Sequence, residues 1–98
     1  MNNSSVFKVI GKYLYDKRKQ FLINKIEKNK FKHFYQKIEI KNIDFLLRKD
    51  VDIIKLLIDK YDMEFINQYS EKDKESDFFI EILEHAKNKE SEWHLFNL

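Results

Sequence analysis

Residues 51–69, VDIIKLLIDKYDMEFINQY, carry the strongest structural signal in the chain. Apolar side chains recur there at helical spacing and make one broad face, formed by Ile53, Ile54, Leu57, Ile58, Tyr61, Phe65, Ile66 and Tyr69. Asp50 or Asp52 stands where a carboxylate can cap the first turn. The pattern predicts a helix from Val51 to Tyr69, with a face wide enough for the centre of a bundle.

A second helix is expected on the C-terminal side of this stretch. Residues 70–75 are charged and predict a turn, and Ser76 followed by Asp77 is typical of a helix start. The side of this helix expected to be buried is marked by Phe79, Ile82, Leu83, Ala86 and Trp93.

On the N-terminal side, Asn42 or Asp44 is placed to cap a short turn that holds residues 45–47. The segment from Phe31 to about Ile40 has apolar residues at helical spacing. Its last five residues, 37–41, alternate between polar and apolar, so a short strand remains the alternative there. We favour a helix because a lone strand would have no evident partner.

The first segment, from Val6 to about residue 29, predicts one long helix capped by Ser4 or Ser5. Its expected buried face comprises Phe7, Ile10, Leu14, Phe21, Leu22 and Ile26. Residues 16–20 are all polar and interrupt this face for a full turn. The long stems of lysine and arginine there are expected to cover the core, unless the helix breaks.

The absence of proline and the presence of one glycine favour helices joined by short turns. We therefore expect an all-α protein, a small single-domain helical bundle of three to five helices over residues 1–98, with 1–5 as a polar lead-in. There is no cysteine for a disulfide or thiolate site, and no segment reads as a secretion signal or membrane span. We expect a cytoplasmic (intracellular) protein that is not bound to a membrane.

Charge is divided unevenly along the chain. Residues 1–41 carry eleven Lys/Arg and three Asp/Glu, a formal charge of +8, whereas residues 42–98 carry eight and fourteen, a charge of −6. Such asymmetry favours an electrostatic partner, and the halves could also attract each other within one molecule or between two copies. The sequence leaves homo-oligomerisation open.

Our functional hypothesis is a non-enzymatic protein-interaction module, such as an inhibitor or accessory subunit, that occupies a charged surface of a larger protein or protein–nucleic-acid complex. The candidate contacts are two groups: Lys17, Arg18 and Lys19, which break the apolar face, and Glu90, Glu92 and Trp93, where an aromatic side chain stands among acids.

The alternative hypothesis is a sequence-nonspecific nucleic-acid-binding protein that uses the basic, aromatic-rich first half. Lysines neutralise phosphates and exposed rings stack on unpaired bases. The residues for this role are Lys17, Arg18, Lys19, Lys25, Lys28, Lys30 and Lys32.

No motif points to catalysis. Gly11 alone cannot form a glycine-rich phosphate loop, and no specific nucleophile–base set stands out. Glu81 and His85 are four residues apart, but a zinc-protease motif needs a second histidine that is not there. We expect no enzyme activity, cofactor or metal.

Overall fold

The computed structural model describes residues 3–28, 38–61 and 63–96, without the side chains of 3–5 and 91–96. Within these ranges the chain forms four α-helices and three short 3₁₀ turns and contains no strand, which confirms the all-α prediction. The order is α1 (Asn3–Glu27), η2 (Ile40–Asn42), η3 (Phe45–Leu47), α2 (Val51–Tyr61), η4 (Ile66–Gln68), α3 (Glu71–Lys74) and α4 (Asp77–Phe96).

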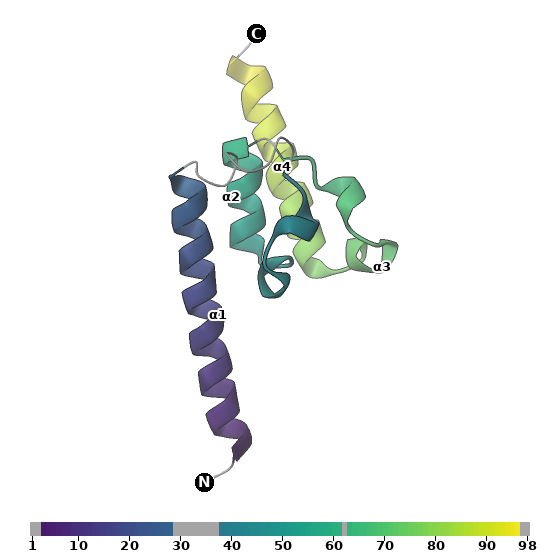
Figure 1. The fold of residues 1–98 in the computed structure, drawn as a ribbon. Coiled ribbons are helices and arrows are strands. Elements are labelled where there is room, and N and C mark those ends of the chain that lie inside the picture. Colours follow the sequence, from purple (N-terminus) through teal and green to yellow (C-terminus); the bar gives the residue numbers. More distant parts are fainter. Residues whose placement is uncertain (1–2, 29–37, 62, 97–98) are drawn as a thin grey trace.

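Helix α2 lies in the middle of the molecule, with α1 along one side and α4 along the other (Figure 1). Its buried side chains are Ile53, Ile54, Leu57 and Ile58. Asp50 caps the helix, because its Oδ1 accepts a hydrogen bond from the Ile53 backbone N–H at 3.1 Å. The central position and the cap agree with the sequence pattern.

The predicted end of this helix was wrong. It stops at Tyr61 instead of Tyr69, and residues 63–65 have no helical structure before η4 begins. Met63 and Phe65 are both buried, on either side of exposed Glu64. The chain thereby brings the rings of Phe65 and Phe79 within 5.7 Å of each other. In place of the two further turns of helix that were predicted after Tyr61, the chain leaves the helix and packs the Phe65 ring against α4.

Tyr69 closes the core at the opposite end of this segment. Its ring packs edge-on against Phe78 at a centroid distance of 5.3 Å, and its hydroxyl donates to the Arg48 carbonyl at 2.6 Å. Burial raises the pKa of this hydroxyl well above its usual value. Ile66, predicted to share the buried face, is exposed instead.

The segment before α2 is shaped by turns and not by the predicted helix. Most of that predicted helix lies outside the described residues, but Ile38 and Glu39 are non-helical and η2 starts at Ile40. The strand alternative is not observed either, although Glu39 has an extended backbone. Arg48 holds the loop by donating to the carbonyls of Ile43 and Lys41 at 3.0 and 2.8 Å. As expected, Asp44 caps η3 by accepting from the Leu46 N–H.

The last two helices follow the sequence pattern with one addition. The predicted turn at 70–75 contains α3, which Ser70 caps through the Asp73 N–H. In α4, Phe79 and Ile82 are buried and Leu83 and Ala86 are partly buried. The side chain of Trp93 lies outside the described part.

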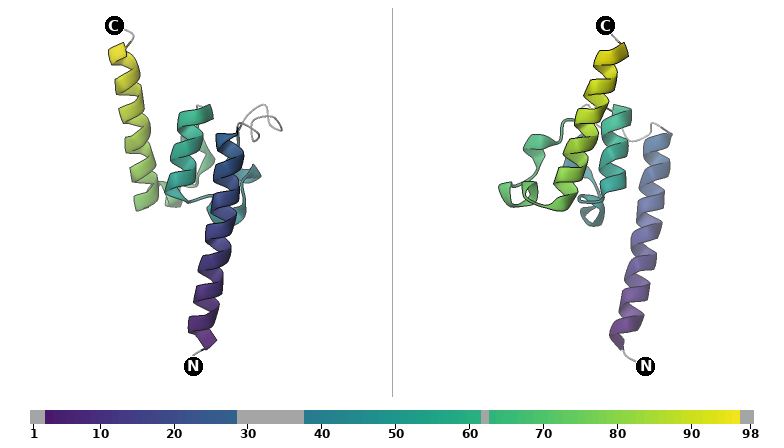
Figure 2. Two further views of the ribbon diagram at one scale, coloured as in Figure 1. Left: turned by 90° about the vertical axis from the view of Figure 1, so that its left-hand side faces the viewer. Right: turned by 180° about the vertical axis from the view of Figure 1, so that it is seen from behind.

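Helix α1 is a single long helix, as predicted, but only its C-terminal half packs on the rest of the molecule. Its N-terminal half extends well past the other helices in every view (Figures 1 and 2), and the molecule measures 61 × 31 × 22 Å. Ser4 and Ser5 were predicted caps, yet they lie inside the helix, because the backbone is already helical at Asn3. No described helix is both long and apolar enough to cross a membrane.

Candidate interaction surface

The projecting half of α1 presents a continuous set of apolar side chains to solvent. The exposed fractions are 41% for Val6, 71% for Phe7, 69% for Val9, 49% for Ile10, 57% for Tyr13 and 51% for Leu14. Phe21, two turns further on, is 70% exposed. The expected burial of Phe7, Ile10, Leu14 and Phe21 was therefore wrong, and only Leu22 and Ile26 of that face reach the core.

The reason lies in helix geometry. Successive residues are about 100° apart around an α-helix, so the apolar residues from Val6 to Leu14 share one arc of roughly 160°. Tyr15, Leu22 and Ile26, which contact the core, lie on an arc centred about half a turn away. Most of the apolar side chains in the first half of α1 therefore point in the opposite direction from those that reach the core in its second half. The free apolar face, defined here as the arc from Val6 to Leu14 continued by Phe21, points away from the core.

The charged residues that interrupt the predicted face mark the place where α1 meets η3 and α2. Arg18 Nε lies 2.7 Å from Asp44 Oδ2, and Lys19 Nζ lies 3.2 Å from Asp50 Oδ2 and 2.7 Å from Asp52 Oδ2. Two of the three basic side chains predicted to contact a partner therefore form ion pairs within the chain. Lys17 is exposed, with its Nζ 5.3 Å from the centre of the Tyr13 ring.

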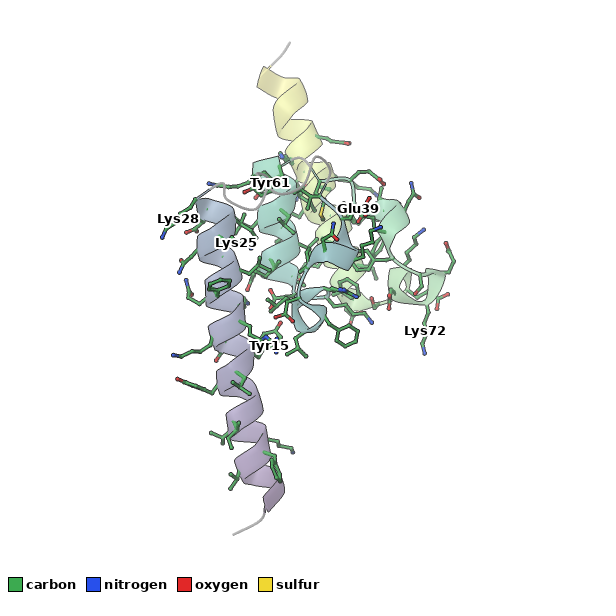
Figure 3. All side chains as sticks on the ribbon, in the orientation of Figure 1. Tyr15, Lys25, Lys28, Glu39, Tyr61 and Lys72 are labelled. Carbon is green, nitrogen blue, oxygen red and sulfur yellow. The ribbon has the colours of Figure 1, made fainter. Side chains whose placement is uncertain are left out.

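At the centre of this contact lies Asp50, the one described polar or charged residue that is buried. Its Oδ2 accepts a hydrogen bond from the hydroxyl of Tyr15, whose side chain is labelled on α1 in Figure 3. Burial by itself would raise the pKa of Asp50, but hydrogen bonds from Tyr15 and the Ile53 N–H, with the Lys19 ammonium, outweigh it and lower that pKa. Asp50 is thus held as a carboxylate that joins α1 to the start of α2.

The Asp50 carboxylate also changes the pKa of Tyr15, its hydrogen-bond donor. Burial, together with the hydrogen bond to Asp50 and its charge, raises the pKa of Tyr15 to about 12. Sequence reasoning missed this pairing. The available signal was that Tyr15 and Lys19 are four residues apart on one side of α1, facing a segment that holds Asp50 and Asp52.

The C-terminal end of α1 is also tied to α2. The hydroxyl of Tyr61 donates to the Ile26 carbonyl, and Lys60 Nζ donates to the Glu27 carbonyl, each at 3.0 Å. These bonds satisfy carbonyls that the helix end leaves without an intrahelical donor. Two tethers at residues 15–19 and 26–27 therefore fix the rotation of α1 about its own axis.

The other predicted contact residues are scattered or lie outside the described part. Glu90 is exposed on α4, whereas the side chains of Glu92 and Trp93 are not described. Lys28 is exposed near the end of α1 (Figure 3), and Lys25 lines a shallow hollow with Arg18 and Phe21. Lys30 and Lys32 fall outside the described residues. Both contact assignments stay predictions.

Glu81 and His85 do not converge on a shared site. Glu81 Oε1 accepts from Lys55 Nζ at 3.1 Å, whereas His85 Nε2 lies 2.8 Å from Asp59 Oδ1. The described residues contain no group of three or more His, Asp or Glu side chains placed to hold a metal ion.

A hollow with a volume of about 760 Å³ lies between η2, η3, the end of η4 and α3. Phe45 forms part of its wall and is 77% exposed. Lys41 and Lys49 also line it, but each is paired with a carboxylate of the same lining, Glu39 at 3.1 Å and Asp73 at 2.9 Å. The positive charges of Lys41 and Lys49 are therefore neutralised within the chain and call for no charged ligand.

Comparisons with protein-family models, curated proteins and solved structures found no match to this chain.

Proposed function

We propose that this protein is a non-enzymatic protein-interaction module, an inhibitor or accessory subunit, whose docking element is the free apolar face of α1. The observation that supports this most is the exposure of Phe7, Ile10 and Leu14 on a helix that extends beyond the rest of the fold. A contiguous exposed apolar patch is uncommon on soluble proteins and marks interaction sites. We expect the protein to act in the cytoplasm.

The spacing of the exposed residues suits a helix that docks by one face. Phe7, Ile10 and Leu14 stand at positions i, i+3 and i+7, which is the anchor pattern of helices bound in apolar grooves or paired with another helix. The tethers at residues 15–19 and 26–27 set which side of α1 faces outward before any partner arrives.

Charge has a smaller part in this proposal than the sequence implied. Arg18 and Lys19 are already paired inside the chain, so their main contribution is to orient α1. Exposed Lys8 and Lys12 remain available to a partner, where they would affect association rate and salt sensitivity more than affinity.

Photo-cross-linking in the native host tests this proposal. A photoreactive amino acid placed at Ile10 is expected to give discrete protein adducts, whereas the same group at Lys12, on the opposite side of the helix, is expected to give few. The proposal would be wrong if the two positions gave the same adducts, or if Ile10 reacted only with lipid or nucleic acid.

The nucleic-acid alternative is favoured by one observation, the exposed rings of Phe7, Tyr13 and Phe21 on a basic helix. Stacking proteins combine such rings with cations along one groove. Here Lys17 lies on the side of the rings, but Lys8 and Lys12 lie about 100° or more from each ring around the helix, which weakens the match. Titration with random-sequence single-stranded DNA is the test, and saturable binding that weakens as salt rises would favour this alternative over the first proposal.

A further inference from the structure

The free apolar face has the spacing of a coiled-coil seam. Phe7, Ile10, Leu14, Lys17 and Phe21 follow one another at intervals of three and four residues, which is the 3.5-residue repeat of paired helices. This stripe is straight over about 21 Å of helix. Lys17 is its one polar member, and the stem of Lys17 lies along the stripe, since its Nζ stands over the Tyr13 ring.

The amount of exposed apolar surface is close to that of a stable interface. The seven side chains of the face are between 41% and 71% exposed. With the roughly 150–250 Å² of an aromatic side chain taken for each, these fractions leave on the order of 600–1,000 Å² uncovered. Specific complexes bury about 800 Å² on each partner, so the face by itself can supply one side of a dimer.

The projecting half also needs support from outside its own fold. A helix of this length has marginal stability in water without tertiary packing. Gly11 lies within it and lowers helix propensity further. A second helix packed on the free apolar face would provide the missing stabilisation.

We infer that the partner docked on the free apolar face is the α1 helix of a second copy of the chain, in antiparallel orientation; the inference rests on the proposed function. In a parallel pair, equivalent residues of the seam face each other, which would place two Lys17 ammonium groups side by side. In an antiparallel pair, Lys17 faces an apolar ring of the other copy instead. Antiparallel helix dipoles also attract each other.

One register fits the seam. With the twofold axis at Lys12, Ile10 meets the second copy's Leu14 on both sides of the axis, and Lys17 meets the second copy's Phe7. The Lys17 stem then covers the ring while its ammonium lies over the face of that ring or reaches water. Because the free apolar face points away from the core, the second copy's helix runs beside Phe21 without meeting α2, and the two globular parts lie at opposite ends.

Sedimentation equilibrium over a range of concentrations tests the association. The unmodified chain is expected to form a dimer, and the paired substitution Ile10→Gln with Leu14→Gln is expected to raise its dissociation constant about a hundredfold or more, because four aliphatic side chains leave the interface. The matched control is Lys8→Gln with Lys12→Gln, which has the same spacing on the opposite side and should leave the dimer intact. Lys17→Met should tighten it by extending the apolar seam.

The relative orientation of the two α1 helices is tested by a spin label. Because the chain has no cysteine, a single introduced cysteine can be labelled without other substitutions. A label on Lys28→Cys is expected to lie on the order of 50 Å from the label of the second copy in the antiparallel dimer, and within about 20 Å in a parallel one. The shorter distance would overturn the orientation and the register together.

The remaining outcomes separate this inference from the function on which it rests. A chain that stays monomeric, yet still gives protein adducts at Ile10, would overturn the dimer and leave the interaction module standing. A monomer that sediments with phosphatidylcholine–phosphatidylserine vesicles through Ile10 and Leu14 would overturn both. A dimer that survives the paired Gln substitution, with unchanged melting of the core, would show that another surface is used.

Discussion

Replacing Asp50 should destabilise the fold more than replacing any other charged residue that the structure describes. Its Oδ1 caps α2 through the Ile53 N–H at 3.1 Å. Its Oδ2 accepts from the Tyr15 hydroxyl and lies 3.2 Å from Lys19 Nζ. Asp50→Ala removes all three contacts, and it also leaves the Tyr15 hydroxyl without its acceptor.

The expected magnitude follows from these contacts. Loss of a cap costs about 1 kcal/mol, and loss of a hydrogen bond to a charged group about 1.5–3 kcal/mol. The Lys19 pair adds at most about 1 kcal/mol, since Lys19 also binds Asp52 at the surface. The variant no longer pays the desolvation cost of a buried carboxylate, and this gain offsets part of the loss. We expect Asp50→Ala to lower the free energy of unfolding by about 3 kcal/mol.

Two further variants distinguish the contributions. Asp50→Asn keeps a capping oxygen but loses the charge, so it should cost less than Asp50→Ala, about 1–2 kcal/mol. Urea unfolding of Tyr15→Phe, Asp50→Ala and the double variant completes a double-mutant cycle. We expect the combined loss to fall short of the sum of the single losses by about 1 kcal/mol or more. Additive losses, or an Asp50→Ala cost below about 1 kcal/mol, would refute the reasoning.

Three further predictions use the same fold. Ile82 is fully buried and Ile80 is 54% exposed on the same helix, so Ile82→Ala should cost about 2–5 kcal/mol and Ile80→Ala less than about 1 kcal/mol in thermal unfolding. Apart from the backbone of its own helix and its chain neighbours, no atom lies within 4 Å of a methyl group added at Gly11, so Gly11→Ala should raise the helical circular dichroism signal without changing the core melting temperature. The folded-state pKa of Tyr15 is about 12, above its ordinary 10.0. Its stabilising effect is therefore complete below pH 10 and lost as pH rises from 10 towards 12, and Tyr15→Phe should flatten that decline in a stability–pH curve.

The sequence predicted α2 well at its start and poorly at its end. Local chemistry decides the start, because Asp50 and the apolar residues that follow it are sufficient to form a capped amphipathic helix. Tertiary packing decides the end. Phe65 and Tyr69 fit the helical spacing, yet they reach the rings of α4 only when the chain leaves the helix. No local pattern carries that information.

The interpretation of α1 failed for a different reason. Periodicity correctly predicted a helix with an apolar face, but it cannot tell what covers that face. Phe7, Ile10 and Leu14 were assigned to the core because every apolar stripe was assumed to be buried within one chain. The polar break at residues 16–20 was the signal that the two halves of the helix have different neighbours, since Arg18 and Lys19 pair with acids of the next elements.

The uneven charge distribution and the exposed apolar face are therefore connected. Basic residues of the first half and acids of the second half attract each other within the molecule, at Arg18 with Asp44 and at Lys19 with Asp50. These pairs, with the Tyr15 hydrogen bond, fix which side of α1 faces the core. Because α1 is one continuous helix from Asn3 to Glu27, its rotation at one end also sets the direction of the apolar residues from Val6 to Leu14 at the other. Weakening the contacts of Asp50 should therefore destabilise the fold and also leave the direction of the free apolar face less well fixed. Asp50→Asn should then weaken the binding of any partner to α1 without changing a residue of that face.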